Sequence, residues 1–524
     1  MHKFKGIRSC RRNGLAMSVL FMISMTVFAS LIGCAPTAGT FNVESGSAPI
    51  EVSRADHKAP NGTLVNEDVV TLPAFSSVDM VDYDDSLKSL LIKYHSANDQ
   101  TSNFLVCDLK SGRSLWSAKS SMTFAVRRAS DLVLSDPTGS KLYDAETGIF
   151  IRVIEPYLFL LEDGRTLQLS REKFAMLDIR TGKKQWELPG HEWTGRREEY
   201  SHGDWFYVVA DGLHALNLPN GTKWEYITPT SFKNVGKEVA KQAALACLAA
   251  FAGGYNTAQY NPDITMNMNS VPVVGDSTVF FAARDKVMSL NKETGRANWV
   301  TEVDPELESM LLLPISDGEL ALVGTGSRIV NSRLDKSDPP TIRIIRKRDG
   351  KVTGLYKMDR WTLAQGFGWT ADRLFLLTPT ELLVFQKDLK LIGIAGSKGE
   401  YGTFTHLLAL GDTIVLRASK GLVGLSKESL AEVWFSYCET APVEVTSEWM
   451  KPYQERLQVG WQSLLKGGNY WTLNEQRELV LYELRSGKSV LKLGMYGKNM
   501  KKVTGMNFVD FENNKVKLVS VETR

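Results

Sequence analysis

The chain has 524 residues, with 62 Lys or Arg against 59 Asp or Glu, which gives a formal net charge of +3 at pH 7. A hydrophobic content of 43% with 23% charged residues is typical of a folded globular chain and excludes wholesale disorder. Five cysteines exclude a scaffold held together by disulfides, because a chain this long can bury its own core. At roughly 150 residues per domain, the length alone suggests three or four domains.

The basic excess lies at the start of the chain. Residues 1–33 contain five cations and no acid, and an apolar run extends from Leu15 to Ile32. A basic region, an apolar region and small residues at the end are typical of an export signal. The final Leu31-Ile32-Gly33-Cys34 resembles a bacterial lipobox, which predicts cleavage before Cys34 and lipidation of that cysteine. The alternative is a single uncleaved membrane anchor. Without residues 1–33, 57 cations face 59 acids, so the basic excess disappears.

The segment after the predicted cleavage site is expected to be a flexible tether over residues 34–67. Between Ala35 and Glu67, 20 of 33 residues are Ala, Pro, Gly, Ser, Thr or Asn, without periodicity. Such a composition predicts a reach on the order of 30 Å. By resemblance to Gram-negative lipoproteins, Ala35 in place of an aspartate favours the outer membrane, with the protein facing the periplasm. We therefore expect a body at residues 68–524 that meets the membrane only through its lipid.

From about residue 69 the chain consists of short strands separated by one recurring turn. The turn begins with Asp or Asn, has Gly four residues later in most copies, and often has Trp four residues after that. Clear copies centre on Gly112, Gly148, Gly182, Gly221, Gly295 and Gly487. Degenerate copies lie at Asp349-Gly350, at Lys387-Asp388, and at Ser426–Trp434, where Leu430 stands in the glycine position. The first three glycine spacings are 36, 34 and 39 residues.

These residue types suit a hairpin between antiparallel strands. Asp or Asn caps the turn, Ser or Thr supports it, and glycine supplies a residue with positive φ. A tryptophan on the returning strand can fill the space between stacked sheets. Self-similarity at this period, with several short strands per repeat, predicts an all-β propeller. The alternative is a β-sandwich with coincidental hairpins of this kind.

The motif Asp-x-x-Thr-Gly-x-x-x-Trp resembles the PQQ-like β-propeller repeat. Residues 178–186, Asp-Ile-Arg-Thr-Gly-Lys-Lys-Gln-Trp, match it throughout. The resemblance covers most of residues 69–521 and implies four-stranded blades. We expect eight blades, or alternatively seven. The turn has nine copies, which we call turn marks, and we expect one degenerate mark to be spurious. Within that superfamily, a lipid-anchored propeller without a cofactor looks most like the propeller lipoproteins of the outer-membrane β-barrel assembly machinery. We expect Asn514–Val521 to close the ring by pairing with Val69–Phe75.

The long spacing between Gly221 and Gly295 predicts an insert at about 231–270. Ala243–Ala252 is entirely apolar and Gly253-Gly254 follows it, which predicts an alanine-rich helix too short to span a bilayer. The helix either packs on its own propeller or docks a partner. The candidate docking residues of this insert are Phe232, Val239, Leu245, Leu248 and Phe251.

A second insert is predicted at about 440–468. Pro452 fits the first turn of a helix, and Tyr453, Leu457, Trp461, Leu464 and Leu465 recur at helical spacing. Such an aromatic stripe is more often core than interface. The candidate docking residues of this insert are Trp449, Tyr453 and Trp461.

The sequence contains little that predicts catalysis. PQQ-dependent dehydrogenases commonly carry two adjacent cysteines, whereas Cys107, Cys247 and Cys438 are scattered, so we expect no PQQ or other cofactor. Cys107 and Cys247 lie in apolar stretches and are predicted to be core residues. His191, His202 and His214 match no metal-ligand spacing, and we expect no metal. Interleaved basic and aromatic residues typical of a nucleic-acid interface are absent.

Together these features predict a non-catalytic scaffold, monomeric on its own, that binds membrane proteins of the cell envelope and supports outer-membrane protein assembly. A rigid ring presents loops from many blades on one face, which suits a broad recognition surface. Two alternatives remain: an enzyme or small-molecule binder that uses the central channel, and a cell-surface protein that binds polysaccharide or matrix.

Overall fold

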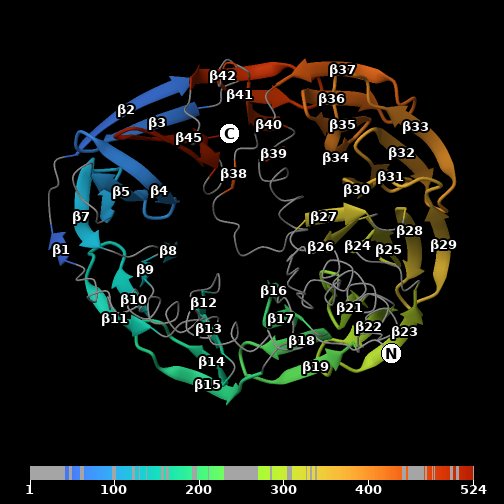
Figure 1. Cartoon of the computed structure of the whole chain (residues 1–524), viewed down its shortest axis with the longest axis horizontal. Helices are drawn as coiled ribbons and strands as arrows, with labels where there is room; N and C mark the ends of the chain where they lie inside the picture. Colours follow the sequence, from blue (N-terminus) through green and yellow to red (C-terminus); the bar gives the residue numbers. More distant parts are fainter. Residues whose placement is uncertain are drawn as a thin grey trace, which may run out of the picture.

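The computed structural model shows a closed ring of β-sheets (Figure 1). It describes residues 42–45, 50–58, 64–96, 102–120, 124–128, 130–136, 139–154, 158–160, 165–170, 172–191, 198–210, 212–228, 270–283, 286–303, 310–325, 327–330, 333–336, 339–438, 444–445, 465–466, 469–474, 476, 478–495, 500–502 and 507–522. Within these ranges the regular elements are all strands, and ten sheets contain four or more strands each. We number these sheets as blades 1 to 10.

The first five blades follow one another along the chain, each with its first strand innermost (Figure 1). Blade 1 contains β4 (Ser76–Asp84), β5 (Ser89–Ser96), β6 (Ser102–Asp108) and β7 (Arg113–Ser120), with β1 (Asn42–Ser45) outside β7. Blade 2 contains β8 (Phe124–Arg128), β9 (Asp131–Asp136), β10 (Gly139–Asp144) and β11 (Phe150–Ile154). Blade 3 contains β12 (Leu158–Leu160), β13 (Thr166–Leu169), β14 (Lys173–Leu177) and β15 (Lys184–Pro189). Blade 4 contains β16 (Glu198–His202), β17 (Trp205–Val209), β18 (Gly212–Asn217) and β19 (Lys223–Ile227). Blade 5 contains β20 (Val273–Val274), β21 (Thr278–Ala283), β22 (Lys286–Asn291) and β23 (Ala297–Glu302).

The other five blades complete the ring. Blade 6 contains β24 (Met310–Pro314), β25 (Glu319–Gly324), β28 (Thr341–Arg346) and β29 (Val352–Lys357). Blade 7 contains β30 (Gly366–Trp369), β31 (Arg373–Leu377), β32 (Glu381–Gln386) and β33 (Leu391–Gly396). Blade 8 contains β34 (Phe404–Leu410), β35 (Thr413–Ala418), β36 (Gly421–Ser426) and β37 (Glu432–Tyr437). Blade 9 contains β39 (Leu465–Lys466), β40 (Asn469–Leu473), β41 (Glu478–Glu483) and β42 (Ser489–Met495). Blade 10 contains β38 (Glu444–Val445), β43 (Lys501–Lys502), β44 (Asn507–Glu512), β45 (Lys515–Glu522), β3 (Leu64–Thr71) and β2 (Glu51–Lys58).

The position of a strand within its blade explains its sequence pattern. Second and third strands are covered on both faces by neighbouring blades, so they are continuous buried runs, as in β17 (Trp-Phe-Tyr-Val-Val). Outer strands diverge from the next blade, so they alternate between exposed and half-buried residues, as in β19, β23 and β33. The hydrophobic core therefore lies in the seams between blades.

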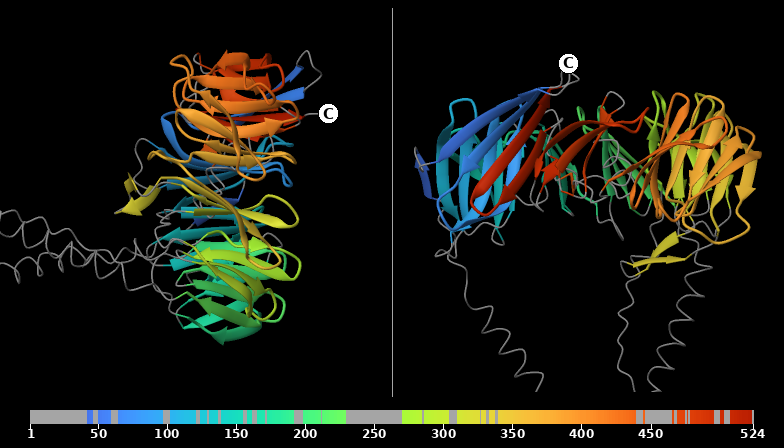
Figure 2. Two further views of the ribbon diagram at one scale, coloured as in Figure 1. Left: turned by 90° about the vertical axis from the view of Figure 1, so that its right-hand side faces the viewer. Right: turned by 90° about the horizontal axis from the view of Figure 1, so that it is seen from above.

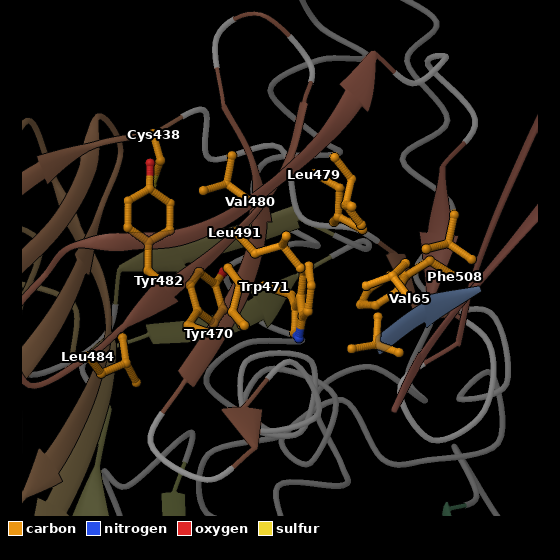
Figure 3. Packing of buried hydrophobic residues seen from close by; sticks show 14 of the residues in the cluster. Val65, Cys438, Tyr470, Trp471, Leu479, Val480, Tyr482, Leu484, Leu491 and Phe508 are labelled. Carbon is orange, nitrogen blue, oxygen red and sulfur yellow. The ribbon is translucent and has the colours of Figure 1, made fainter. Parts of the chain in front are cut away.

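Every seam of the ring contains a cluster of buried apolar side chains. Eight clusters each join two successive blades, and a ninth joins blades 8, 9 and 10. Figure 3 shows part of this ninth cluster, in which Trp471 of blade 9 lies beside Phe508 of blade 10, with ring centroids 5.7 Å apart, and near Val65 of β3. The contribution of the N-terminal strand to this cluster means that closure of the ring buries apolar surface as well as pairing backbone.

Blade 10 is built from both ends of the chain. Strand β3 pairs antiparallel with β45, with Val69 opposite Lys517 and Val65 opposite Val521. This confirms that the C-terminal strand closes the ring on the N-terminal part of the body, although the paired segment is 64–71 and ends before Phe75. A closed sheet leaves no free edge at the junction of the two termini.

The predicted number of eight blades, or seven, is wrong. All nine turn marks are hairpins between the third and fourth strands of a blade, with φ between 58° and 74° at the glycine position. That set includes Leu389 (φ 67°) and Leu430 (φ 58°), so no mark is spurious. The tenth blade has no such turn because its C-terminal strand β45 pairs with β3 and does not continue into it.

The segment 34–67, expected to be an unpaired tether, contains strands. Strand β1 pairs with the outer strand β7 of blade 1, and β2 pairs with β3 along its whole length. Strand β2 is an outer edge strand, and its polar sequence Glu-Val-Ser-Arg-Ala-Asp-His-Lys suits that place. Composition therefore did not distinguish an edge strand from a linker here.

The two predicted helical inserts lie largely outside the described residues. Residues 229–269 are not described, so the helix predicted within 231–270 is not tested. In the second insert, Glu444–Val445 and Leu465–Lys466 are strands β38 and β39. Leu465, which was assigned to the helical stripe, therefore belongs to the inner edge strand of blade 9, where it pairs with Tyr470. Within the described ranges, no segment has the helical length and hydropathy of a membrane span.

A hairpin that the sequence did not predict interrupts blade 6. Strands β26 (Ser327–Val330) and β27 (Arg333–Lys336) pair with each other and join no blade. Figure 2 shows this hairpin projecting from one face of the ring, beyond the edges of the blades. The hairpin therefore gives that face of the ring a protrusion.

Candidate functional site

The repeated turns are held by their own polar side chains. In blade 3 the carboxylate of Asp178 accepts hydrogen bonds from the amide (2.7 Å) and the hydroxyl (2.9 Å) of Thr181. The amide of Gly182 donates to the carbonyl of Asp178 (2.8 Å). These bonds from Thr181 lower the pKa of the Asp178 carboxyl below its usual range. The Asp and Thr of the motif are thus used within the turn and carry no evident role in binding.

The tryptophans of the motif join successive blades. Each indole Nε1 donates a hydrogen bond to a backbone carbonyl in the turn of the next blade: Trp116 to Ala145 (2.9 Å), Trp186 to Leu218 (2.7 Å), Trp224 to Lys292 (2.7 Å), Trp299 to Lys347 (2.8 Å) and Trp434 to Arg485 (3.0 Å). The turn glycine of the next blade leaves the space in which the ring lies, because a Cβ on Gly295 would be 2.5 Å from the ring of Trp224. The motif is therefore structural.

The outer strands of blades 6, 7 and 8 carry exposed apolar side chains, which we call the rim patch. It comprises Val352, Leu355, Leu391, Ile392, Ile394, Val433 and Tyr437, which are 36–61% exposed. The three strands, β29, β33 and β37, follow one another around the outside of the ring (Figure 1). By contrast, blades 4 and 5 expose one large apolar residue each on their outer strands, Ile227 and Val300. Exposed apolar side chains on successive outer strands make this part of the ring a candidate binding surface.

A second feature lies in the seam between blades 3 and 4. The side chains of His191, His214 and Glu225 present three potential ligand atoms within 4.8 Å of one another. His214 Nδ1 lies 3.5 Å from Glu225 Oε2, His191 Nδ1 lies 4.0 Å from the same oxygen, and the two imidazole centroids are 4.8 Å apart. We call these three residues the histidine cluster. It borders a cavity of about 290 Å³ lined mainly by apolar residues, among them Phe174, Val208 and Leu216.

Sequence reasoning considered His191 and His214 but missed Glu225. Their spacings match no linear metal motif, and only strand register brings them together: His214 on β18 is the cross-strand partner of Glu225 on β19. The hairpin around Gly221 would have predicted that pairing. His202, the third histidine considered, lies on β16 opposite Trp205 and does not join the cluster.

None of the residues predicted as functional can be placed. Cys34 and all the candidate docking residues lie outside the described residues, namely Phe232, Val239, Leu245, Leu248, Phe251, Trp449, Tyr453 and Trp461. The insert helices therefore remain predictions. The rim patch was not predicted, because outer strands with mixed apolar and polar residues have no distinctive sequence signal.

The two thiols in the described residues are core residues. Cys107 is fully buried, as the sequence predicted, and Cys438 is 2% exposed. Burial raises the pKa of each thiol to about 12, so neither forms a thiolate readily at neutral pH. Cys247 lies outside the described residues.

Comparison with known proteins agrees with the repeat. A family model described as outer membrane protein assembly factor BamB matches residues 170–401, which run from blade 3 into the segment before blade 8. No curated protein sequence matches the chain. Solved structures that resemble it include BamB from Moraxella catarrhalis (10% identity, 69% of this chain and 95% of that chain, TM-score 0.37) and the designed Ika8 protein (12% identity, 70% and 98%, TM-score 0.31). Since both TM-scores are low, they carry no argument here: the chain is a β-propeller with repeats similar to the PQQ-like repeat, and its residues 170–401 resemble the assembly factor BamB.

Proposed function

We propose that this protein is a lipid-anchored, non-catalytic scaffold of the outer membrane that faces the periplasm and binds envelope proteins engaged in outer-membrane protein assembly. The observation that carries this proposal is the match of residues 170–401 to the assembly-factor family. That range includes the outer strands of blades 6 and 7, which contribute five of the seven residues of the rim patch.

The rim patch suits a protein partner. Its side chains are aliphatic or tyrosine, they stand on strands of the ring, and those strands are held from behind by the buried seams around blade 7. A surface on rigid elements loses little conformational entropy when it binds, so more of the burial energy contributes to affinity. Anchoring to the same membrane as the partner would raise the effective concentration of a weak interface.

The lipid anchor is tested apart from the binding surface. The variant Cys34→Ser should abolish labelling of the protein by a palmitate analogue in intact cells and release it from the membrane fraction. Labelling that persists in Cys34→Ser would contradict the lipobox, and surface proteolysis of intact cells would show whether the ring faces the periplasm.

The binding surface is tested by crosslinking in intact cells followed by mass spectrometry of the captured proteins. The triple variant Leu355→Glu, Ile394→Glu and Val433→Glu places a charge on each strand of the rim patch at positions that are 53–61% exposed. We expect recovery of membrane partners to fall at least tenfold. The matched control is Ile227→Glu with Val300→Glu, which adds charges to the outer strands of blades 4 and 5. Equal recovery from the wild type and the triple variant would exclude the rim patch as the docking site.

A further inference from the structure

The histidine cluster has the donor chemistry and the spacing of a transition-metal site. Two imidazole nitrogens and one carboxylate oxygen are the ligand set that zinc takes in open, three-ligand sites. Metal–ligand distances of about 2.0–2.2 Å in a tetrahedral arrangement place neighbouring ligand atoms roughly 3.3–3.6 Å apart. Glu225 Oε2 lies 3.5 Å from His214 Nδ1 and 4.0 Å from His191 Nδ1, and all three ligand atoms lie within 4.8 Å of one another. Side-chain rotations that draw the two imidazoles together would bring the set to this geometry.

The fold holds these three residues on supported elements. His214 and Glu225 face each other across the β18–β19 ladder, and His191 follows directly after β15 of the preceding blade. The seam is fixed beside them by Trp186, whose indole donates to Leu218 (2.7 Å) and lies against Gly221. His214 is 8% exposed, whereas the His191 and Glu225 side chains are 32% and 55% exposed, so solvent reaches the cluster through these two residues.

We propose that His191, His214 and Glu225 bind one zinc ion in the seam between blades 3 and 4. Three protein ligands leave a fourth coordination position for water or a small anion. The adjoining cavity of about 290 Å³, lined by Phe174, Val208 and Leu216 among others, gives that fourth ligand room. The ion would also tie blade 3 to blade 4, since His191 lies at the end of one blade and the other two ligands lie on the other.

One neighbouring charge opposes metal binding. Lys223 stands two residues before Glu225 on the same face of β19 and also lines the cavity. Its ammonium donates to the carbonyl of Pro189 (3.2 Å) and lies 5.7 Å from the centroid of the Phe174 ring. Replacing this cation by a neutral side chain removes repulsion and should tighten metal binding, whereas a merely structural His–Glu cluster predicts no effect on zinc affinity.

The test is calorimetric titration of the full-length, chelator-treated chain in detergent with Zn²⁺, and with Co²⁺, whose visible absorption reports tetrahedral coordination. We expect one equivalent of Zn²⁺ with a dissociation constant below 10⁻⁶ M as an order of magnitude. His214→Ala and Glu225→Gln should each weaken binding at least tenfold, and Lys223→Met should strengthen it several-fold. His202→Ala, outside the cluster, is the matched control.

Three results would overturn the proposal: no saturable binding by the wild type, unchanged binding in both His214→Ala and Glu225→Gln, or equal weakening in His202→Ala. Circular dichroism of each metal-free variant shows whether the propeller is intact. Because Glu225 is largely exposed, Glu225→Gln keeps the test valid if the buried His214→Ala variant fails to fold. The readout is metal affinity, so it is independent of the proposed scaffold function.

Discussion

In the seams between blades 3 and 6, a tryptophan on the outer strand of one blade lies against a turn glycine of the next blade, as Trp224 does against Gly295. In the two seams on either side of blade 7, the bulky residue and the glycine exchange places. We call these the leucine seams, and those between blades 3 and 6 the tryptophan seams. Leu389 and Leu430 occupy the turn position, and each lies against a glycine on the preceding outer strand, Gly354 and Gly393 respectively. The bulky residue therefore lies on the outer strand in a tryptophan seam and in the turn of the next blade in a leucine seam.

This exchange shows that the seam selects a pair of side chains and not a residue type. One bulky apolar group is needed to fill the space, and the opposing position must then be glycine, because interiors tolerate neither a void nor an overlap. The two kinds of seam also differ in hydrogen bonding and in backbone conformation. The indole adds a hydrogen bond to the next turn, as from Trp224 to Lys292, whereas Leu430 adopts φ 58°, a conformation that costs a non-glycine residue roughly 1–2 kcal/mol.

The largest expected effect comes from converting one kind of seam into the other. Trp224→Gly removes the indole and its hydrogen bond and should cost about 4 kcal/mol of unfolding free energy. Gly295→Leu places a side chain where a Cβ would already be 2.5 Å from the indole, and should cost about 3 kcal/mol or more. The double variant recreates a leucine seam. We expect its loss of unfolding free energy to be at least about 2 kcal/mol smaller than the sum of the losses in the two single variants. Urea denaturation followed by circular dichroism measures these losses.

Additive losses in this double-mutant cycle would contradict the exchange model. Full recovery is not expected, because Trp224 also contacts Trp205 and Tyr207, at centroid distances of 6.4 and 6.3 Å, and leucine at position 295 does not replace those contacts.

The next effect separates steric overlap from backbone conformation in the tryptophan seam. Gly295→Ala adds a Cβ 2.5 Å from a rigid ring at φ 67°, and should cost about 2–4 kcal/mol. Gly203→Ala is the matched control: φ is 57° and no atom lies within 4 Å of the added Cβ, so only the backbone cost of about 1 kcal/mol remains. Equal losses of unfolding free energy in the two variants would show that position 295 requires glycine because of its positive φ and not because of the indole.

The seams also show which parts of the fold can be predicted from the sequence. Turn chemistry and period located all nine turns, including the degenerate ones at Leu389 and Leu430, although one of them was discounted to fit eight blades. The closing pair of β45 and β3 was predicted, but blade 10 was not counted as a blade of its own, since no local turn joins these two strands. Strand β2 was missed because an exposed edge strand has no apolar alternation.

The site was less predictable than the fold. The sequence contained His191 and His214, but their approach to Glu225 depends on cross-strand register and on how blade 3 meets blade 4. The rim patch depends on three strands about 40 residues apart following one another around the outside of the ring. Neither relation is encoded in a linear motif.

A smaller effect is expected at the leucine seam for the same steric change. In Gly393→Ala the added Cβ is again 2.5 Å from its neighbour, but that neighbour is the terminal Cδ1 of Leu430, whose next atom is 3.7 Å away. A flexible side-chain end can rotate aside where an indole ring cannot, so we expect a loss of at most about 1 kcal/mol. A loss as large as that of Gly295→Ala would show that the two seams are equally rigid.

The smallest effect concerns an ion pair across the same leucine seam. Lys427 in the turn of blade 8 donates to Asp372 of blade 7 at 2.9 Å, and the Thr370 hydroxyl donates to the same carboxylate at 2.8 Å. These bonds lower the pKa of Asp372 to about 2. Because the folded-state pKa lies below the unfolded value of about 3.9, the stabilisation is complete above pH 4 and disappears as the pH falls towards 2.

The side chain of Asp372 is 56% exposed, so solvent screening limits the contribution of the pair to a few tenths of a kcal/mol. We expect Asp372→Asn to lower the unfolding free energy by that amount at pH 7 and low salt. The difference from the wild type should shrink in 1 M NaCl and vanish near pH 2, as measured by urea denaturation at each condition. A difference that persists in high salt and at pH 2 would mean that the position matters for turn geometry and not for charge. Gly393→Ala and Asp372→Asn together then determine whether the leucine seam depends on packing or on the ion pair beside it.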